Sequence, residues 1–424
     1  MIRRRDLARA LDRKRVADWV IFERTQDIAL ADAIRHEKPM HRREQRLRMA
    51  FVVHVDSSRG RGSTHVEVAS QDEDVGEIVD RAIELALATI GPGWKSVPAS
   101  APAKVALLDP AIGKRDVHAI AMGIAGSLRA PQPTTVTACA RVTRETIVVD
   151  THAGLTSKWD ASTYEVDALV GDGRSSIAVH REARREADLE LDATIASAAA
   201  DLALLANAEP VKSGPCALVL DANAFLFDDS TGVWSVFATQ ADAVLERQGL
   251  TRYRVGVPVV PGADTVDPPL TITSNGALDF ATRSAPIGED GDAIRRFTIV
   301  ERGIAKDLGL TPREAALRGR DPNGGVRNLM VSPGTWDGSM PNKRTIEVRR
   351  LRGLAIDPYT GEASLELAIS IDHVGAKQQT FTGGTIRLDL VAALSRARRA
   401  STIIRRGAYH GPARLVIDDT NLVV

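Results

Sequence analysis

The sequence predicts an α+β fold in two domains that meet near residue 211. Before that point, strand-like runs alternate with amphipathic helical segments, whereas most of the chain beyond it resembles short antiparallel strands rich in Val, Thr, Gly and Pro. The 424 residues are 44% hydrophobic and 26% charged, which is ordinary for a globular protein. We therefore expect an N-terminal mixed α/β-sheet domain at 1–211 and a C-terminal, mostly antiparallel β domain at 212–424.

In the first half, the strongest helix signal covers residues 71–90, because its first turn is acidic and its apolar residues recur at helical spacing. We expect its buried side to include Val75, Ile78, Val79, Ala82, Ile83, Leu85 and Ala86. Weaker helix signals lie at 6–17, 114–128 and 186–207. Strands are expected at 19–22, 48–55, 63–68, 134–141, 145–150 and 162–170.

In the second half, residues 326–361 carry the clearest pattern. A strand ends at Pro333-Gly334, residues 345–351 alternate between apolar and charged, and Asp357-Pro358 followed by Gly361 predicts a tight turn. The stretch lacks a nucleophile, a metal cluster and a phosphate loop, so we expect it to frame a site or an interface. A helix is predicted at 387–406, and short strands at 216–220, 257–260, 270–273, 296–300 and 304–308.

The overall charge is balanced, with 55 Lys and Arg against 55 Asp and Glu, which weighs against nucleic acid as a partner. Residues 1–50 are locally basic, with 14 Lys/Arg against 8 Asp/Glu. This surplus predicts a solvated amphipathic start, with a basic docking arm as the alternative. Two cysteines, no apolar leader and no run of ~18 apolar residues predict a cytoplasmic protein without a membrane span.

One segment has the letters of a zinc-peptidase motif. His36, Glu37 and His41 fit H-E-x-x-x-H, in which two imidazoles on one helical face hold the metal and the glutamate acts as general base. Pro39 lies in the middle of the segment and opposes a helix there. The surroundings are polar and basic, without an apolar wall that excludes water, so we interpret the match as coincidental.

Other chemistry-bearing groups are scattered. His373, His410 and Cys216 would form a mixed site only if the fold joined them, and satisfied or surface side chains are the simpler interpretation. The carboxylate pairs at Asp228-Asp229 (beside Ser230) and Glu289-Asp290 suit solvated turns better than acid–base catalysis. The sequence contains no G-x-S-x-G, so nucleophilic acyl transfer has no support.

Several segments in order resemble the TldD/PmbA (TldE) family over most of the chain. In the first half these are GRGSTHVEVAS, DTHAGLTSKWD and the long helix before EPVKSGPCALVLD. In the second half they are GEDGDAIRRFTIVERGIAKDL, LGLTPREAALRG, GGVRNLMVSPGT and LRGLAIDPYTGEASLELAISI.

The resemblance implies a function. TldD-type subunits carry an H-E-x-x-x-H helix early in the C-terminal domain and a cysteine near the C-terminus, and they bind zinc. That helix should begin close to Ala222–Gly232 here, but no histidine lies between His180 and His373, and no cysteine follows Cys216. The chain thus resembles a TldE-type subunit with no metal ligands of its own, and the resemblance implies zinc in a TldD-like partner.

The resemblance implies a heterodimer that degrades or trims small or unfolded peptides, for example in peptide maturation or leader removal. It points to Asp290, Arg296, Asn328, Pro333 and Gly334 as candidates for a peptide channel or interface, and to no catalytic residue in this chain. Two alternatives stay open at this point: a self-sufficient metallohydrolase that uses His36/His41 or His373/His410, and a homodimeric peptide-binding module without catalysis.

Overall fold

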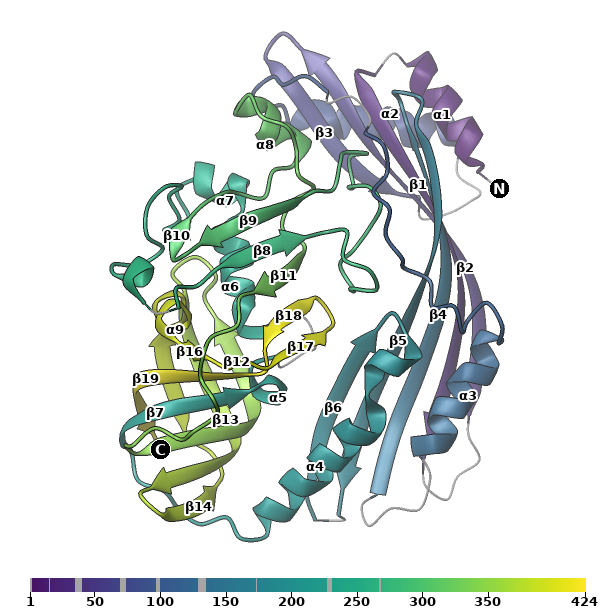
Figure 1. The fold of residues 1–424 in the computed structure, drawn as a ribbon. Coiled ribbons are helices and arrows are strands. Elements are labelled where there is room, and N and C mark those ends of the chain that lie inside the picture. The colour runs from purple at the N-terminus through teal and green to yellow at the C-terminus, as the bar shows by residue number, and fades with distance from the viewer. Residues whose placement is uncertain are drawn as a thin grey trace.

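The computed structural model describes residues 2–14, 16–34, 40–68, 74–96, 100–128, 135–172, 174–226, 231–266 and 268–424. Three β-sheets and short helices make up the protein, which confirms the predicted α+β class. Figure 1 shows one long, twisted sheet beside a second body that holds the other two sheets. The first sheet uses residues up to 183 and the other two begin at 214. The exact domain boundary near 211 stays a prediction.

The N-terminal sheet is antiparallel throughout, in the order β3-β2-β1-β4-β5-β6. One face is covered by α3 and α4, whose apolar residues pack on alanines and valines of β1, β4 and β5. The elements are α1 (Arg4–Arg13), β1 (Asp18–Ala33), β2 (His41–Ser57), β3 (Gly60–Glu67), α2 (Val75–Ala88), α3 (Val117–Leu128), β4 (Thr135–Thr151), β5 (Thr156–Gly171), β6 (Ser176–Ala183), the 3₁₀ turn η1 (Glu186–Leu189) and α4 (Leu191–Leu205).

The C-terminal half forms two sheets around the largest apolar core. One has the order β10-β9-β8-β11-β18-β17; in the other, β12 pairs with both β7 and β13, which closes β12, β7, β19, β15 and β13 into a barrel. The strands are β7 (Gly214–Asp221), β8 (Ile272–Asn275), β9 (Arg296–Glu301), β10 (Ile304–Ala305), β11 (Asn328–Val331), β12 (Thr345–Ile356), β13 (Glu362–Val374), β14 (Lys377–Phe381), β15 (Thr385–Asp389), β16 (Arg398–Arg399), β17 (Ile403–Arg406), β18 (Tyr409–Pro412) and β19 (Arg414–Val423).

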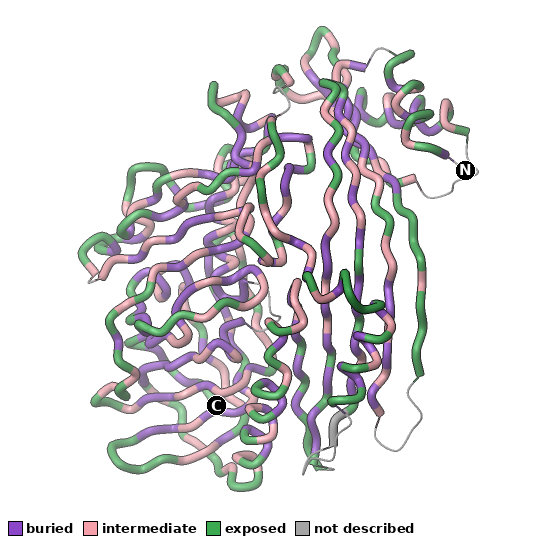
Figure 2. Tube along the Cα trace, turned by 45° about the vertical axis from the view of Figure 1, so that its right-hand side comes forward, coloured by how far each residue is buried: buried purple, intermediate pink, exposed green. Residues whose placement is uncertain are grey.

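Short helical elements fill the loops between these strands. They are α5 (Ala222–Phe225), η2 (Gly232–Trp234), α6 (Ser235–Gln240), α7 (Ala243–Arg247), η3 (Ala263–Thr265), α8 (Pro312–Leu317) and α9 (Leu390–Arg396). Figure 2 shows that buried positions run through the centre of this half, while exposed ones follow its rim and the outer strands of the first sheet. None of the described helices is long and apolar enough to cross a membrane.

Two predicted local structures are confirmed. Helix α2 lies within the predicted 71–90 segment and begins at an N-cap, because the side chain of Asp74 accepts hydrogen bonds from the N–H groups of Gly76 and Glu77. The turn after β12 forms as expected: the N–H of Gly361 donates to the carbonyl of Asp357 at 2.8 Å, and Gly361 has a φ of +77°.

Three predictions about elements are wrong. The helix expected at 387–406 is confined to α9, and the basic residues after it form β16 and β17 because they pair with β19 and β18. Residues 257–260 make only an isolated bridge to β10. Leu85 of α2, expected to be buried, is 49% exposed, since α2 contacts the sheet through a narrower stripe than the apolar pattern suggests.

The two halves meet at a loop between β8 and β9. The N–H of Gly288 donates to the carbonyl of Asp292 at 2.9 Å, so residues 288–292 form a tight turn. A Cβ at Gly291 would lie 2.7 Å from the side chain of Thr151 in β4, and Ile287 packs on Val20 and Val149 of the first sheet. This loop therefore docks the C-terminal half onto the N-terminal sheet.

Candidate peptide-binding site

A cavity of about 510 Å³ lies where three parts of the chain converge. The connection between β6 and α4 contributes Arg185, Asp188 and Glu190, the β7–α5 junction contributes 221–223, and the edge strand β17 contributes its full length. Larger clefts exist elsewhere. This one combines fixed charges, the start of a helix and the edge of a sheet, and it lies where the resemblance places the beginning of the metal-binding helix.

Asp221 anchors the floor of the cavity. Its side chain caps α5 by accepting hydrogen bonds from the N–H groups of Asn223, at 2.8 Å, and Ala224, at 3.2 Å. It also lies 3.2 Å from a guanidinium nitrogen of Arg349. Burial raises the pKa of Asp221, and the positive charges of Arg349 and Arg350 oppose that rise.

A buried carboxylate ties this floor to the N-terminal half. Asp201 of α4 is 1% exposed, and its two oxygens contact Nε of Arg349 at 3.1 Å and Nε of Arg350 at 2.7 Å. Since both arginines belong to β12, the ion pairs join the two halves of the protein. Removing the carboxylate or the arginines would leave the remaining charge poorly solvated. The network therefore holds the walls of the cavity in fixed positions relative to each other.

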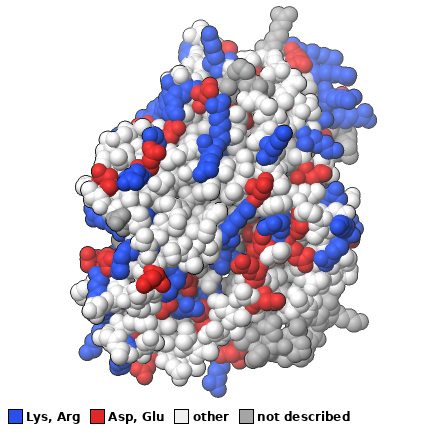
Figure 3. All heavy atoms as spheres, viewed as in Figure 1, with Lys and Arg blue, Asp and Glu red and all other residues white. Residues whose placement is uncertain are grey.

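A second polar bridge crosses the cavity. Nη1 of Arg406 in β17 donates to Oδ1 of Asn223 at 3.0 Å, and Nδ2 of Asn223 lies 3.3 Å from the hydroxyl of Ser197 in α4. Opposite, Arg185 forms two hydrogen bonds with Asp188, at 2.8 and 2.7 Å, and its guanidinium lies 4.5 Å from the ring centre of Phe280. The walls thus present oriented charges of both signs. Figure 3 shows acidic and basic groups likewise intermixed over the middle of the face seen in Figure 1.

Strand β17 offers backbone groups to the cavity. It is the last strand of its sheet. Among the described residues it pairs with β18 alone, across a two-residue turn at 407–408. The pair next to such a turn, Arg406 and Tyr409, is hydrogen-bonded, and the pattern alternates from there. The N–H and C=O groups of Ile403 and Arg405 therefore point away from β18, and Ile403 is 53% exposed.

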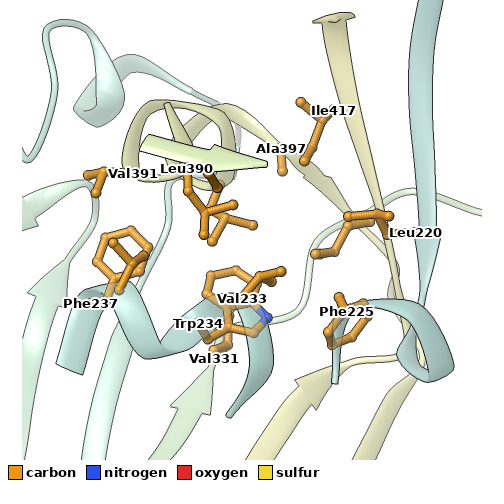
Figure 4. Close-up of a cluster of buried hydrophobic side chains, with 14 of the residues drawn as sticks. Leu220, Phe225, Val233, Trp234, Phe237, Val331, Leu390, Val391, Ala397 and Ile417 are labelled. Atoms are coloured by element: carbon orange, nitrogen blue, oxygen red, sulfur yellow. The ribbon is translucent and has the colours of Figure 1, made fainter. Parts of the chain in front are cut away.

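The segment that follows α5 is built as apolar core. Val233, Trp234, Val236 and Phe237 are all fully buried. The ring of Trp234 stacks on Tyr409, with ring centres 6.2 Å apart. Figure 4 shows Trp234 and Phe237 facing the apolar side chains of α9, β7 and β19, with the indole nitrogen of Trp234 as the only polar side-chain atom among the labelled residues.

These residues do not fit a zinc site. Residues 222–240 contain no histidine or cysteine, and the described inward-facing positions are taken by aromatic and aliphatic carbon. Across the described part of the chain, no group of three or more His, Cys, Asp or Glu side chains could hold a metal ion. Of the H-E-x-x-x-H letters, His36 and Glu37 lie outside the described residues, as do Asp228, Asp229 and Ser230.

The remaining metal candidates lie apart. His41 begins β2, is exposed, and its ring contacts that of His118 at a centre distance of 4.7 Å. His373 in β13 is bound to Glu347 at 3.1 Å, whereas His410 belongs to a different sheet. Cys216 is buried, with Sγ 3.4 Å from the hydroxyl of Thr420.

The predicted channel candidates do not converge on the cavity. Asp290 lies in the loop that docks on the N-terminal sheet, where burial and the nearby Asp292, Glu289 and Asp18 raise its pKa to about 7. Arg296 is exposed and lines a smaller cleft of about 380 Å³ beside Asp321. The structure therefore separates Asp290 and Arg296 from β17.

The other three candidates have structural partners. The side chain of Asn328 is fully buried; it accepts from the N–H of Arg283 and donates to the carbonyl of Asn275. Pro333 and Gly334 run against the buried Arg399, and a Cβ at Gly334 would lie 2.2 Å from the carbonyl oxygen of Arg399. Sequence reasoning missed β17 and Asp221, for which neither a motif nor a spacing signal exists.

Comparisons with known proteins agree with this geometry. A family model described as the PmbA/TldA metallopeptidase C-terminal domain matches residues 231–422. The second half of the protein is thus a metallopeptidase-like domain. The comparison with curated proteins found no match.

Three solved structures share the fold along the whole chain. Two are proposed modulators of DNA gyrase, from Bacteroides thetaiotaomicron (TM-score 0.76, 15% identity, 100% of this chain and 99% of that one) and Thermotoga maritima (0.77, 15%, 99% of each). The third is TldE from Thermococcus kodakarensis (0.73, 14%, 99% of each). Together they show that this chain has the fold of these proteins, and that its second half matches the C-terminal domain of the PmbA/TldA family.

Proposed function

We propose that this protein is the metal-free, TldE-like subunit of a two-subunit peptidase, in which a TldD-like partner supplies the zinc. One observation carries the proposal. At the β7–α5 junction, where the resemblance places the metal-binding helix, the sequence of residues 222–240 contains no histidine, and the described residues 222–226 and 231–240 contribute buried apolar core. Because Trp234 and Phe237 occupy this position as apolar core, we assign a structural role to this chain and the metal chemistry to the partner.

The role left to this chain is to hold peptide. An extended peptide that pairs with β17 would accept hydrogen bonds from the outward N–H groups of Ile403 and Arg405 and donate hydrogen bonds to their C=O groups. Main-chain pairing is independent of sequence, which suits an enzyme that trims small or unfolded peptides. Arg185 and Asp188 would then meet side chains of the bound strand on the opposite wall.

The rigid parts around the cavity would keep that strand in place. Asp221, Asp201 and the two arginines of β12 fix the floor, and the loop at 288–292 fixes the angle between the halves. Of the five candidates that the resemblance suggests for a channel or interface, Arg296 and Pro333 are exposed and would meet the partner, whereas Asp290, Asn328 and Gly334 would support that surface from within. Maturation of a small peptide product, or removal of its leader, is the activity that we propose for the complex.

Co-expression with a homologue that carries the H-E-x-x-x-H motif tests the proposal. We expect a stable complex with one zinc per two chains, which cleaves an unstructured peptide, and an isolated chain that is inactive. Zinc bound stoichiometrically to the isolated chain, with peptidase activity lost in Glu37→Gln, would overturn the proposal in favour of a self-sufficient hydrolase. Failure to co-purify, with no gain of proteolysis, would overturn it in favour of a homodimeric peptide-binding module.

Variants of β17 test the peptide-holding role separately. Arg405→Pro removes an outward N–H without breaking a bond to β18, and proline is tolerated at such edge positions. We expect the complex to assemble with normal zinc content and a KM raised about tenfold, as for the loss of one or two hydrogen bonds. Arg405→Ala, the matched control for the side chain, retains the N–H. An equal KM for the two variants would exclude main-chain pairing at β17.

A further inference from the structure

The first half of β2 is an exposed sheet edge. Strand β3 covers β2 only from Ala50 to Ser57, with one further bond from the N–H of Val68 to the carbonyl of Met49. From His41 to Arg48, β2 pairs with β1 alone among the described residues. Seven of these eight residues are exposed, and Figure 2 shows the run of exposed positions along the outer strand. Such an edge presents unpaired backbone groups.

The hairpin fixes which backbone groups are free. Ser57 and Gly60 flank a two-residue turn and form a hydrogen-bonded pair, so the odd-numbered residues of β2 direct their N–H and C=O groups toward the β3 side. The bond from Val68 to the carbonyl of Met49 agrees with this register. The backbone N–H and C=O groups of residues 41, 43, 45 and 47, which precede Met49 in β2, therefore point outward from the sheet. An added strand would continue the line of β3.

The side chains give this edge a net positive charge. Residues 41–48 hold four arginines and one glutamate, and so account for much of the basic surplus of the first fifty residues. Arg43 lies on the α3 side, where Asp27 and Asp116 neutralise it at 2.7 and 3.2 Å. Three other arginines lie on the opposite face of β2, at positions 42, 46 and 48.

Two of those three arginines contact a carboxylate on their own strand. Arg42 contacts Glu44 at 2.7 Å, and Nε of Arg46 donates to Glu44 at 2.6 Å. The side chain of Arg48 has no hydrogen bond or ion pair with any described residue, although its backbone pairs with β1. The cross-strand neighbour of Arg48 on β1 is Arg24, which is another cation. The open face of the edge therefore carries an excess of positive charge beside free backbone donors and acceptors.

We propose that the edge of β2 from His41 to Arg48 binds an acidic peptide segment in extended conformation by strand addition. Backbone pairing would hold the segment, and its alternate side chains would be Asp or Glu that face Arg42, Arg46 and Arg48. A second copy of this chain is a poor occupant. Antiparallel pairing of two such edges would set Arg42 opposite Arg46 or Arg48, and like charges at opposite positions are destabilising.

This site goes beyond the proposed function and is independent of it. Strands β2 and β6 are separated by β1, β4 and β5. Four strand spacings place the edge of β2 roughly 19 Å across the sheet from β6, which borders the cavity. The sites also differ in character, since the cavity carries both signs and the edge of β2 is mainly basic. Loss of peptidase activity in the complex would leave this binding site unaffected.

Fluorescence anisotropy on the full chain tests the proposal. The probe is a fluorescein-labelled octapeptide, Thr-Glu-Val-Glu-Thr-Glu-Val-Glu, with a Lys-for-Glu version and a version with proline at alternate positions as controls. We expect saturable binding of the acidic probe alone, weakened by salt because the contacts lie near solvent. Absence of binding at about 1 mM protein, a concentration that detects even weak complexes, would refute the site.

Two pairs of variants separate backbone pairing from charge. Gln45→Pro removes an outward N–H but no bond to β1, and we expect binding about tenfold weaker, against less than twofold for Gln45→Ala. Arg48→Glu should weaken binding about fivefold or more, while Arg59→Glu makes the same charge change in the β2–β3 turn and should have little effect. Thermal unfolding verifies that each variant folds.

Two outcomes would overturn the proposal even if the probe binds. Equal affinities for Gln45→Pro and Gln45→Ala would show that the backbone of this edge is not used. Equal effects of Arg48→Glu and Arg59→Glu would show that the peptide responds to the overall charge of the protein and not to this strand.

Discussion

Replacing Asp290 by Asn should stabilise the protein at neutral and alkaline pH. Asp290 lies in the loop at 288–292 that docks on the N-terminal sheet, beside Asp292, Glu289 and Asp18. Burial is the main cause that raises its pKa to about 7, and the three neighbouring carboxylates add to the rise. Asn has nearly the same shape but cannot ionise, so the substitution removes an unfavourable charge and leaves the packing of the loop intact.

The magnitude follows from the pKa of Asp290 in the folded and unfolded chain. A rise from 3.8 to about 7 corresponds to about 4 kcal/mol of stability lost when the group ionises in the folded state. Solvent reaches part of this side chain, so we expect about 1–3 kcal/mol. Because the folded pKa is raised, the favourable contribution is complete below about pH 4 and is lost as the pH rises through about 7. Asp292, with a pKa of about 6, acts in the same direction.

Urea unfolding followed by tryptophan fluorescence at pH 5, 6, 7 and 8 measures the effect. We expect the Asn variant to be slightly more stable than the parent protein already at pH 5, and the difference to grow up to about pH 7 and to level off by pH 8. Glu289→Gln, in the same loop but exposed, is the matched control and should change stability by less than about 0.5 kcal/mol. An Asp290→Asn protein that is no more stable than the parent at pH 8 would refute the assignment of a buried, like-charged carboxylate.

Three further predictions concern packing and buried polar groups, and urea unfolding measures each of them. Trp234→Ala should cost about 3–5 kcal/mol because it opens a cavity in the fully buried core beside Tyr409; a cost below about 1 kcal/mol would contradict that packing. Asp201→Ala should cost about 3 kcal/mol because it leaves two arginines of β12 without their buried partner, and an exposed control, Asp192→Ala, should be nearly neutral. Asn328→Ala should cost about 2–3 kcal/mol because it leaves the carbonyl of Asn275 and the N–H of Arg283 unpaired, and an unchanged midpoint would show that solvent replaces these bonds.

Much of the local structure could be predicted from the sequence, since short-range chemistry determines it. The turn after β12 follows from Asp357-Pro358 and a glycine that takes the left-handed conformation. The start of α2 follows from Asp74, whose side chain can cap a helix wherever the helix lies. The class of fold follows from the change in pattern near residue 211, and it is confirmed.

Longer-range pairing overrode the local pattern elsewhere. Residues 398–406 have helical periodicity, but they are extended because β18 and β19 offer hydrogen-bonded partners. Strand β4 was expected as two strands, at 134–141 and 145–150, yet it is continuous because residues 142–144 pair with β1 on one side and with β5 on the other. The pattern of side chains does not reveal which distant strand will pair with a segment. The lengths and ends of the strands were therefore predicted poorly.

The candidate site was predicted only in part. The resemblance directed attention to the β7–α5 junction, and a cavity does lie there. The five residues expected to line a peptide channel or an interface do not line this cavity: Asn328 is committed to hydrogen bonds in the core, and Arg296 lines another cleft. The free edge of β17 and the pairing of Asp201 with Arg350 depend on residues about 150 positions apart, which no local motif records.

The sequence by itself determined the α+β class, the turn chemistry, the family resemblance and the lack of histidine where a zinc-binding helix was expected. These properties depend on residue identity and on spacing over a few positions. Only the tertiary structure decided that Trp234 and Phe237 fill that position as core, and that no described strand covers the outer edge of β17 or of the first half of β2. Burial and strand pairing join distant parts of the chain through the balance of desolvation and hydrogen bonding, so they emerge only when the whole fold is assembled.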